Sequence, residues 1–276
     1  MKKHLLVSLI VMLLLSACKK DKTNTDVPLT GTILLSGISN ANYAPLASFT
    51  YSGKLLAKAV LTDGAFAETH QFNYDSQGNL TGTTISSANP AYVGDVSSVI
   101  TYSAGNISEI KFYKGNNFLD QDITFVYVAN GFNWTNSFYV GNSQYAQFYG
   151  IYYYSNNNVS MQSATLGFYG EQINPGDVDT QNNICKAFPL YLYFATNVAQ
   201  PHPCIPQIPG ANNPTDYSTY IGQGGHIPGS ITYTYNANNY PSSANMVALT
   251  YTINSSLIYW VTATTAQYNY SYIGVQ

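Results

Sequence analysis

The sequence predicts an all-β protein, an antiparallel meander of repeated hairpins that forms an extended or strongly curved sheet, with one irregular loop insert. Three observations lead there. A short aromatic-plus-turn unit recurs along the chain. Charged residues make up only 8% of the chain against a usual value near 25%, while tyrosine reaches 26 residues, a composition typical of strands and polar turns. No long stretch shows the helical period with caps.

The clearest copy of the unit runs from Phe72 to Leu80. Phe72 and Tyr74 are two apart, so in a strand they lie on one face. The Asp75 carboxylate suits a turn because it accepts a hydrogen bond from the backbone two residues on. Gly78 supplies the positive φ of a turn followed by a bulge, and Leu80 begins the return strand. This unit therefore predicts a hairpin.

The tyrosines that mark the copies are separated by similar steps. The steps between the first five are 23, 28, 25 and 27 residues, and the last step is 81, which is three times 27. The marker tyrosines are Tyr51, Tyr74, Tyr102, Tyr127, Tyr154 and Tyr235. A step near 27 fits two strands and two turns, and such periods indicate a repetitive architecture in which neighbours bury each other's faces.

The segment Tyr74-Asp75-Ser76-Gln77-Gly78-Asn79-Leu80 resembles the YD-repeat unit of the Rhs and teneurin type, which usually has Arg where this chain has Asn79. Over about residues 31–276 the chain is more similar still to YD-repeat-like lipoproteins of Bacteroidota. The segment from Asp179 to Asn183 and on to Phe188 resembles an insert seen between repeats there. The resemblance implies a lipoprotein signal, a tyrosine-rich β-meander and a largely undefined function. The closed cages of the Rhs type need many more repeats and are not implied.

Residues 1–17 are expected to be a lipoprotein signal peptide. Lys2 and Lys3 precede an apolar run too short to span a bilayer as a resident helix, and Leu15-Ser16-Ala17-Cys18 matches a lipobox. Cys18 is therefore the predicted lipidation site and membrane anchor, the alternative being an ordinary secretory signal with a chance cysteine. Residues 18–30 form a flexible tether, and residues 31–276 a single β-domain. The expected location is the cell envelope, as an outer membrane lipoprotein on either its periplasmic or its surface face.

Within the domain, alternating apolar residues separated by turn formers predict strands and hairpins in order. The terminal strand carries Tyr268, Tyr270 and Tyr272 in alternation and is expected to protect a sheet edge. The segment Tyr145–Tyr154 is aromatic on both alternations, which predicts burial of both its faces. The other predicted β segments are Gly31–Leu35, Phe49–Leu61, Glu68–Ile85, Val99–Tyr113, Ile123–Val128, Trp134–Val140, Met161–Tyr169, Ile231–Tyr235, Val247–Ile253 and Leu257–Thr264.

Residues 171–230 depart from the repeat and are expected to form the irregular insert. Five prolines fall within residues 199–214, followed by a glycine-rich stretch. With Cys18 acylated, Cys185 and Cys204 are the two remaining thiols, and we expect them to form a disulfide outside the cytoplasm. Two metal sites remain as alternatives. One is a zinc site from Cys185, His202, Cys204 and His226, and the other a calcium site from Glu171, Asp177 and Asp179.

Charge and missing motifs exclude several functions. Removal of the signal peptide leaves 8 Lys and 13 acidic residues, a charge of −5, with no Arg, so nucleic acid is not an expected partner. The hydrolase motif Gly-x-Ser-x-Gly does not occur. His70 is interpreted as a packed or surface residue beside Phe72. Asp75, Asp120 and Asp122 are interpreted as solvated or turn-capping groups.

These observations predict a non-catalytic, membrane-anchored lipoprotein with a repetitive β-scaffold, a surface or envelope protein with a binding or structural role and no cofactor. Its expected partners are the membrane, through Cys18, and a glycan or an envelope protein. One alternative is a glycan-binding accessory module, which would display a flat patch of exposed Tyr or Trp. The other is a hydrolase sited in the insert, which would bring Asp177, Asp179, His202 or His226 together in a pocket.

Overall fold

The fold was analysed in a computed structural model of the chain. It describes residues 28–63, 66–89, 94–141, 143–155, 158–166, 169–175, 179–183, 191–192, 212–213, 215–221, 225–254 and 257–276. Nearly all of these residues lie in strands or their turns, so the all-β prediction is confirmed. In the described part of the chain, no helix is both long and apolar enough to cross a membrane.

Sixteen strands are described, and a short 3₁₀ helix, η1 (Gly115–Asn117), joins β7 to β8. The strands are β1 (Thr32–Asn40), β2 (Pro45–Ser52), β3 (Leu55–Asp63), β4 (Phe66–Tyr74), β5 (Leu80–Ser87), β6 (Asp95–Ser103), β7 (Asn106–Lys114), β8 (Phe118–Val128), β9 (Gly131–Val140), β10 (Ser143–Ser155), β11 (Asn158–Leu166), β12 (Tyr169–Pro175), β13 (Asp216–Ile221), β14 (Gly225–Tyr235), β15 (Pro241–Asn254) and β16 (Leu257–Val275).

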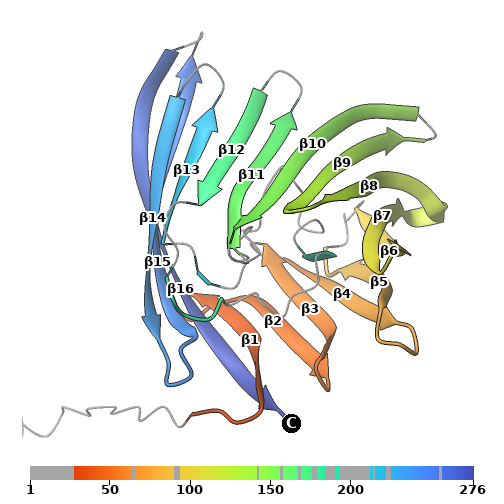
Figure 1. Cartoon of the computed structure of the whole chain (residues 1–276), viewed down its shortest axis with the longest axis horizontal. Helices are drawn as coiled ribbons and strands as arrows, with labels where there is room; N and C mark the ends of the chain where they lie inside the picture. Colours follow the sequence, from red (N-terminus) through yellow and green to blue (C-terminus); the bar gives the residue numbers. More distant parts are fainter. Residues whose placement is uncertain are drawn as a thin grey trace, which may run out of the picture.

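The strands form one closed antiparallel barrel in which each strand pairs with its neighbours in sequence. Figure 1 shows them following one another around the ring in chain order, with β16 returning beside β1. The seam between β1 and β16 runs from Thr32 opposite Val275 to Asn40 opposite Tyr268. The predicted meander is thus confirmed, and the sheet curves until its first and last strands pair and close the barrel. The tyrosine-rich last strand protects an edge as expected, because β16 also pairs with β15.

The predicted turn chemistry is present in the unit that follows β4. The Asp75 carboxylate accepts hydrogen bonds from the backbone amides of Gln77 and Asn79 at 2.9 and 2.8 Å. Gly78 has a φ of +85°, a value that L side chains rarely adopt. The register shifts at Tyr74, as it does at Tyr51, Tyr102, Tyr154 and Tyr235, so five of the six marker tyrosines stand at a bulge.

The marker tyrosines also tie neighbouring strands together through their hydroxyls. Tyr51 donates to the carbonyl of Leu35 at 2.7 Å, and Tyr74 to that of Leu56 at 2.9 Å. Burial raises the pKa of Tyr74 to about 12, so this phenol remains a donor at neutral pH. Because the strands alternate in direction, all the turns that follow marker tyrosines lie at one end of the barrel, here called the tyrosine end. The connection from β12 to β13 lies at the same end.

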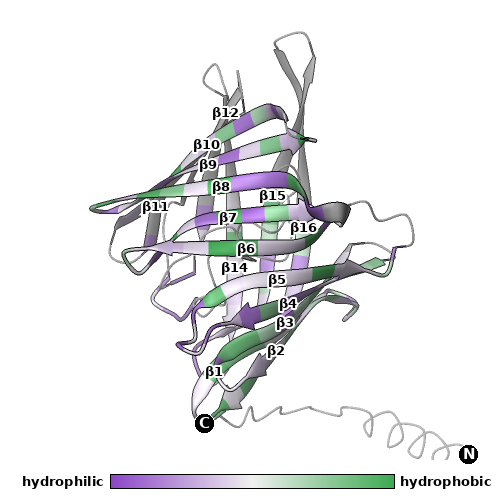
Figure 2. Cartoon of the chain, turned by 90° about the vertical axis from the view of Figure 1, so that its right-hand side faces the viewer, coloured by the Kyte–Doolittle hydropathy of each residue, from purple (hydrophilic) through white to green (hydrophobic). Residues whose placement is uncertain are grey.

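The inner face of the barrel wall is mainly apolar, and its outer face mixes polar groups with exposed apolar side chains such as Val99 and Val126. Two adjacent rows of paired residues crossing β6 to β10 show this directly. The inner row is Ile100, Ile110, Ile123, Asn136 and Phe148, and the outer row is Val99, Lys111, Asp122, Ser137 and Gln147. The first four residues of the inner row are buried, and the three isoleucines among them belong with residues of β1 to β5 and β16 to one hydrophobic core. Figure 2 shows purple and green segments following one another along β7, and a longer purple stretch in β8.

The structure corrects two expectations. Residues 171–175, 216–221 and 225–230 of the expected irregular insert lie in strands β12, β13 and β14, so these parts of it are regular sheet. Antiparallel pairing satisfies the backbone there, and even Pro228 is accommodated in β14 opposite Ser218. The strand around Tyr145–Tyr154 is not buried on both faces. Tyr152 is buried inside, whereas Tyr145 and Tyr149 are 63% and 52% exposed, because outward positions of the wall face solvent.

Candidate functional site

A polar cluster inside the barrel is centred on Tyr191, which comes from the β12–β13 connection. Tyr191 and its neighbour Leu192 are fully buried. The Tyr191 hydroxyl lies 3.0 Å from His70 Nδ1 and 2.9 Å from Thr83 Oγ1. Its ring packs edge-on against Phe72, with the centroids 5.7 Å apart. The connection therefore sends an amphipathic side chain into the barrel, where the wall supplies both apolar and hydrogen-bonding contacts.

Both ring nitrogens of His70 are engaged in this cluster. Its Nε2 lies 2.6 Å from Glu68 Oε1, which leaves Nδ1 for the Tyr191 hydroxyl. Thr83 extends the chain of contacts to Ser98, with 2.8 Å between their hydroxyl oxygens. His70 is 1% exposed, as the packed reading of this residue predicted. The arrangement satisfies buried polar groups and locks Tyr191 in place.

A carboxyl pair, Asp95 and Asp120, adjoins this cluster. Burial, followed by the nearby Asp120 charge, raises the pKa of Asp95 to about 7. Asp120 is held by Lys114, whose Nζ lies 2.6 Å from its Oδ1. Gln121 donates to Asp95 at 3.4 Å. The reading of Asp120 as a solvated turn residue was wrong, because Lys114 pairs with it where its side chain is only 13% exposed.

The interpretation of Asp75 and Asp122 as solvated or turn-capping groups holds for Asp75 and not for Asp122. Asp75 caps its turn as predicted. Asp122, however, lies within β8 on the outer face, with an oxygen 3.8 Å from Lys111 Nζ. Partial burial, followed by the nearby Glu109 charge, raises the pKa of Asp122. Its position opposite Lys111 on the neighbouring strand explains the ion pair, which single-chain spacing does not reveal.

Asp179 holds the two ends of the β12–β13 connection together. One of its oxygens accepts from the backbone amides of Gln181 and Asn213, at 2.8 and 3.1 Å. The other accepts from the Asn213 side chain at 3.1 Å and from the Tyr235 hydroxyl. These four donors use the acceptor capacity that a calcium site would require from Asp179. In the residues that the structure describes, no group of three metal-ligating side chains occurs.

Asparagines continue this bonding to the neighbouring turns. Asn212 and Asn158 exchange hydrogen bonds, at 2.9 Å from the Asn212 amide and 3.1 Å from the Asn158 side chain. The backbone amide of Asn182 donates to the carbonyl of Asn239 at 3.1 Å. The connection is thus attached to the β10–β11 and β14–β15 turns on either side of it. The Asp-and-Asn segment that stood out in the sequence has a structural role at the tyrosine end.

The remaining predicted site residues fall into two groups: five lie outside the described residues, and two lie in strands. Cys18, Asp177, Cys185, His202 and Cys204 lie outside the described residues, so neither the lipid anchor nor the disulfide or the zinc alternative has a geometry here. Backbone strands pass through two more: Glu171 lies in β12 and His226 in β14. The two strands lie on either side of β13: Glu171 is opposite Ile221, and His226 is opposite the neighbouring residue, Tyr220.

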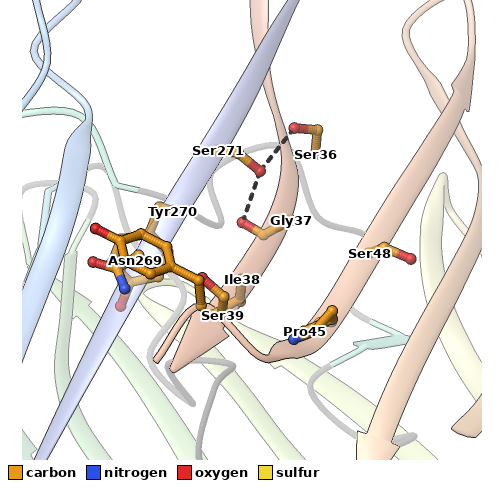
Figure 3. Close-up of a pocket in the computed structure, with 11 residues that line it drawn as sticks. Ser36, Gly37, Ile38, Ser39, Pro45, Ser48, Asn269, Tyr270 and Ser271 are labelled. Atoms are coloured by element: carbon orange, nitrogen blue, oxygen red, sulfur yellow. Dashed lines mark hydrogen bonds between the residues drawn. The ribbon is translucent and has the colours of Figure 1, made fainter. Parts of the chain in front are cut away.

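A hollow opens on the barrel seam between β16, β1 and β2, here called the seam hollow (Figure 3). It has a volume of about 390 Å³. Gly37 lies at its centre, paired with Ser271 on one side and with Ser48 on the other. All eleven lining residues are uncharged, and most bear hydroxyl or amide groups or small side chains. Sequence reasoning missed it, because it depends on pairing between the first and the last strand.

Comparisons with known proteins give similarities to solved structures only. No family model and no curated protein matches the chain. A porin-like protein from Bacteroides uniformis is 16% identical with a TM-score of 0.43, and the match covers 89% of this chain and 99% of that one. A porin-like protein from Bacteroides vulgatus is 11% identical with a TM-score of 0.48, covering 86% and 98%.

Proposed function

We propose that this chain is a non-catalytic, membrane-anchored lipoprotein of the bacterial cell envelope, whose barrel stands in water beside the bilayer and serves as a binding or structural scaffold. The anchor is the lipid on Cys18, read from the lipobox. In this proposal the YD-repeat-like lipoproteins of Bacteroidota remain the family that the chain resembles.

The observation that carries the proposal is the polarity of the outer row on β6 to β10. Lys111 lies between Glu109 at 2.8 Å and Asp122 at 3.8 Å, and Gln147 donates to Ser137 at 3.0 Å. A strand that contacts lipid carries an apolar band outside, and a Lys at mid-membrane costs about 2–4 kcal/mol. The core lies instead on the inner side of these strands. This row therefore favours water over lipid around β6 to β10, and the proposal assigns membrane attachment to a separate anchor.

A structural role for the interior polar groups supports the non-catalytic part. His70 is fully buried and both its nitrogens contact other side chains, so it is not presented to a substrate. The Tyr191 hydroxyl occupies the position next to His70 Nδ1 that a substrate would need. A general base must reach the proton that it abstracts, and this geometry reserves His70 for the β12–β13 connection.

Cell fractionation tests the anchor. The full chain is expressed in a Bacteroides host with its own signal peptide, and in parallel with a non-lipoprotein secretory signal and Cys18→Ser. We expect the first protein in the membrane pellet and in the detergent phase of a Triton X-114 partition. The second should appear in the soluble envelope fraction. Retention of the second protein in carbonate-washed membranes would show that the wall itself contacts lipid and would refute the proposal.

A further inference from the structure

The seam hollow exists because a glycine lies between two hydroxyl-bearing neighbours on the outer face. Phe49 and Ala47 point into the core, so Ser48 between them points outward. Gly37 pairs with Ser48 and with Ser271, and a side chain at Gly37 would meet Ser271 Oγ at 2.9 Å. The three residues therefore form a notch in the wall with Ser48 on one side and Ser271 on the other. The Ser271 hydroxyl donates to the Gly37 carbonyl at 3.4 Å and accepts from the Ser36 hydroxyl at 3.1 Å.

An exposed aromatic residue stands at the edge of the notch in an unfavourable backbone conformation. Tyr43, in the β1–β2 turn, is 76% exposed and has a φ of +60°. The Asn40 side-chain oxygen fixes the turn by accepting from the amides of Asn42 and Ala44, at 2.9 and 3.0 Å. A bulky residue with positive φ is a true outlier, and such strain persists mainly where function favours it. A glycine would relieve it, yet this turn presents a phenol ring to solvent.

The chemistry of this surface fits a neutral, hydroxyl-rich ligand. The exposed Ser48 hydroxyl has one donor and two acceptor sites, the Ser271 hydroxyl keeps an acceptor site beside its bonds to Ser36 and Gly37, and no lining residue bears a charge that would favour an anion or a cation. The Tyr43 ring supplies an apolar face with a polar tip. Sugars present the matching pair of surfaces, an apolar ring face and peripheral hydroxyls. We propose that the seam hollow binds a neutral saccharide, with Tyr43 against the sugar ring.

The position of the hollow in the barrel agrees with a binding role. The chain enters β1 at the tyrosine end, where Leu29 exchanges hydrogen bonds with the Asn238 side chain. Nine residues of β1 span roughly 30 Å. The β1–β2 turn with Tyr43 is therefore at the opposite end from the tether and points away from the anchored side. This inference rests on the proposed function, since it names the ligand class of the proposed scaffold.

Glycan binding by the full-length chain, purified in detergent, tests the inference. The probes are neutral oligosaccharides built from glucose, mannose, galactose or N-acetylglucosamine, with sulfated and uronic acid oligosaccharides as charged counterparts. We expect at least one neutral probe to bind saturably. Tyr43→Ala should raise its Kd at least about tenfold, and Tyr43→Phe should stay within about threefold. Tyr145→Ala, which removes another well-exposed tyrosine on β10, outside the lining of the hollow, is the matched control and should leave the Kd unchanged.

Three results would overturn the inference. They are no saturable binding of any neutral probe up to about 10 mM, equal binding of Tyr43→Ala and the wild-type chain, and equal or tighter binding of the charged probes. Because this titration is made in detergent, it does not depend on where the cell places the protein. A failed fractionation test with intact saccharide binding would refute the lipid anchor alone. A successful fractionation test without saccharide binding would refute the saccharide site alone.

Discussion

The hydroxyl of Tyr191 lies 3.0 Å from Nδ1 of His70, although the two residues are 121 positions apart in the chain. One belongs to the connection between β12 and β13, and the other to the wall strand β4. The contact is buried and shared with Thr83. It makes the connection part of the core of the barrel.

Removal of this hydroxyl should destabilise the fold. Tyr191→Phe keeps the ring but leaves His70 and Thr83 with unmet polar atoms in the interior, which costs about 1–3 kcal/mol. Tyr191→Ala also leaves a cavity and should cost about 3–5 kcal/mol. Urea unfolding monitored by circular dichroism measures both. Tyr145→Phe, at an exposed site, is the control, and an equal loss there would disprove the special role of Tyr191.

The Asp95–Asp120 pair predicts a pH dependence of stability. The folded pKa of Asp95 is about 7, above its ordinary value, so the folded state holds a proton that the unfolded state has released. This contribution is present in full below the unfolded pKa and is lost as pH rises through 7. We expect the free energy of unfolding to fall by about 1–3 kcal/mol from about pH 5 to pH 8. The Asp95→Asn variant should show a flatter profile, and an unchanged slope would contradict the pairing.

Asp179 should govern the attachment of the β12–β13 connection. Asp179→Ala removes the acceptor of four hydrogen bonds, two of them from the buried Asn213, and should cost about 2–4 kcal/mol. Tyr235→Phe removes one donor only and should cost about 1 kcal/mol. Chemical unfolding gives both values. A larger effect of Tyr235→Phe than of Asp179→Ala would place the anchor elsewhere.

Gly150 permits the close approach of an aromatic ring. A Cβ there would lie 2.0 Å from the Trp134 ring, which is buried and rigid. Gly150→Ala should therefore destabilise the barrel by about 1–3 kcal/mol and shift the tryptophan emission. Gly115→Ala provides the comparison, because its Cβ would meet nothing within 4 Å. That variant should stay within about 0.5 kcal/mol of wild type.

Relief of strain at Tyr43 should stabilise the protein. Tyr43→Gly removes the steric cost of φ near +60° and should raise the free energy of unfolding by about 1 kcal/mol. Thermal unfolding of this variant beside Tyr43→Phe, which keeps the strain, measures the difference. A loss of stability on Tyr43→Gly would mean that the ring makes contacts worth more than the strain.

Local residues predicted the hairpins, because turn chemistry is encoded within a few positions. Asp75 and Gly78 dictate their turn wherever it is placed in space. Closure of the ring was not predictable, since Thr32 and Val275 carry no mark of their pairing. The same holds for the sites. Tyr191 lies in the range 171–230, which the sequence predicts to be an irregular insert. Asp95 and Asp120 meet only because the barrel brings β6 and β8 close to each other.

The pairing of β1 with β16 has a consequence for biogenesis. Asn40 and Asn269 are bonded across 229 positions, so the ring cannot close until β16 is available to pair with β1. Until then both β1 and β15 present an open strand edge to other chains, which invites aggregation. Folding of this protein should therefore depend on protection of these edges until β16 pairs, and loss of the β16 residues that pair with β1 should be far more harmful than their sequence suggests.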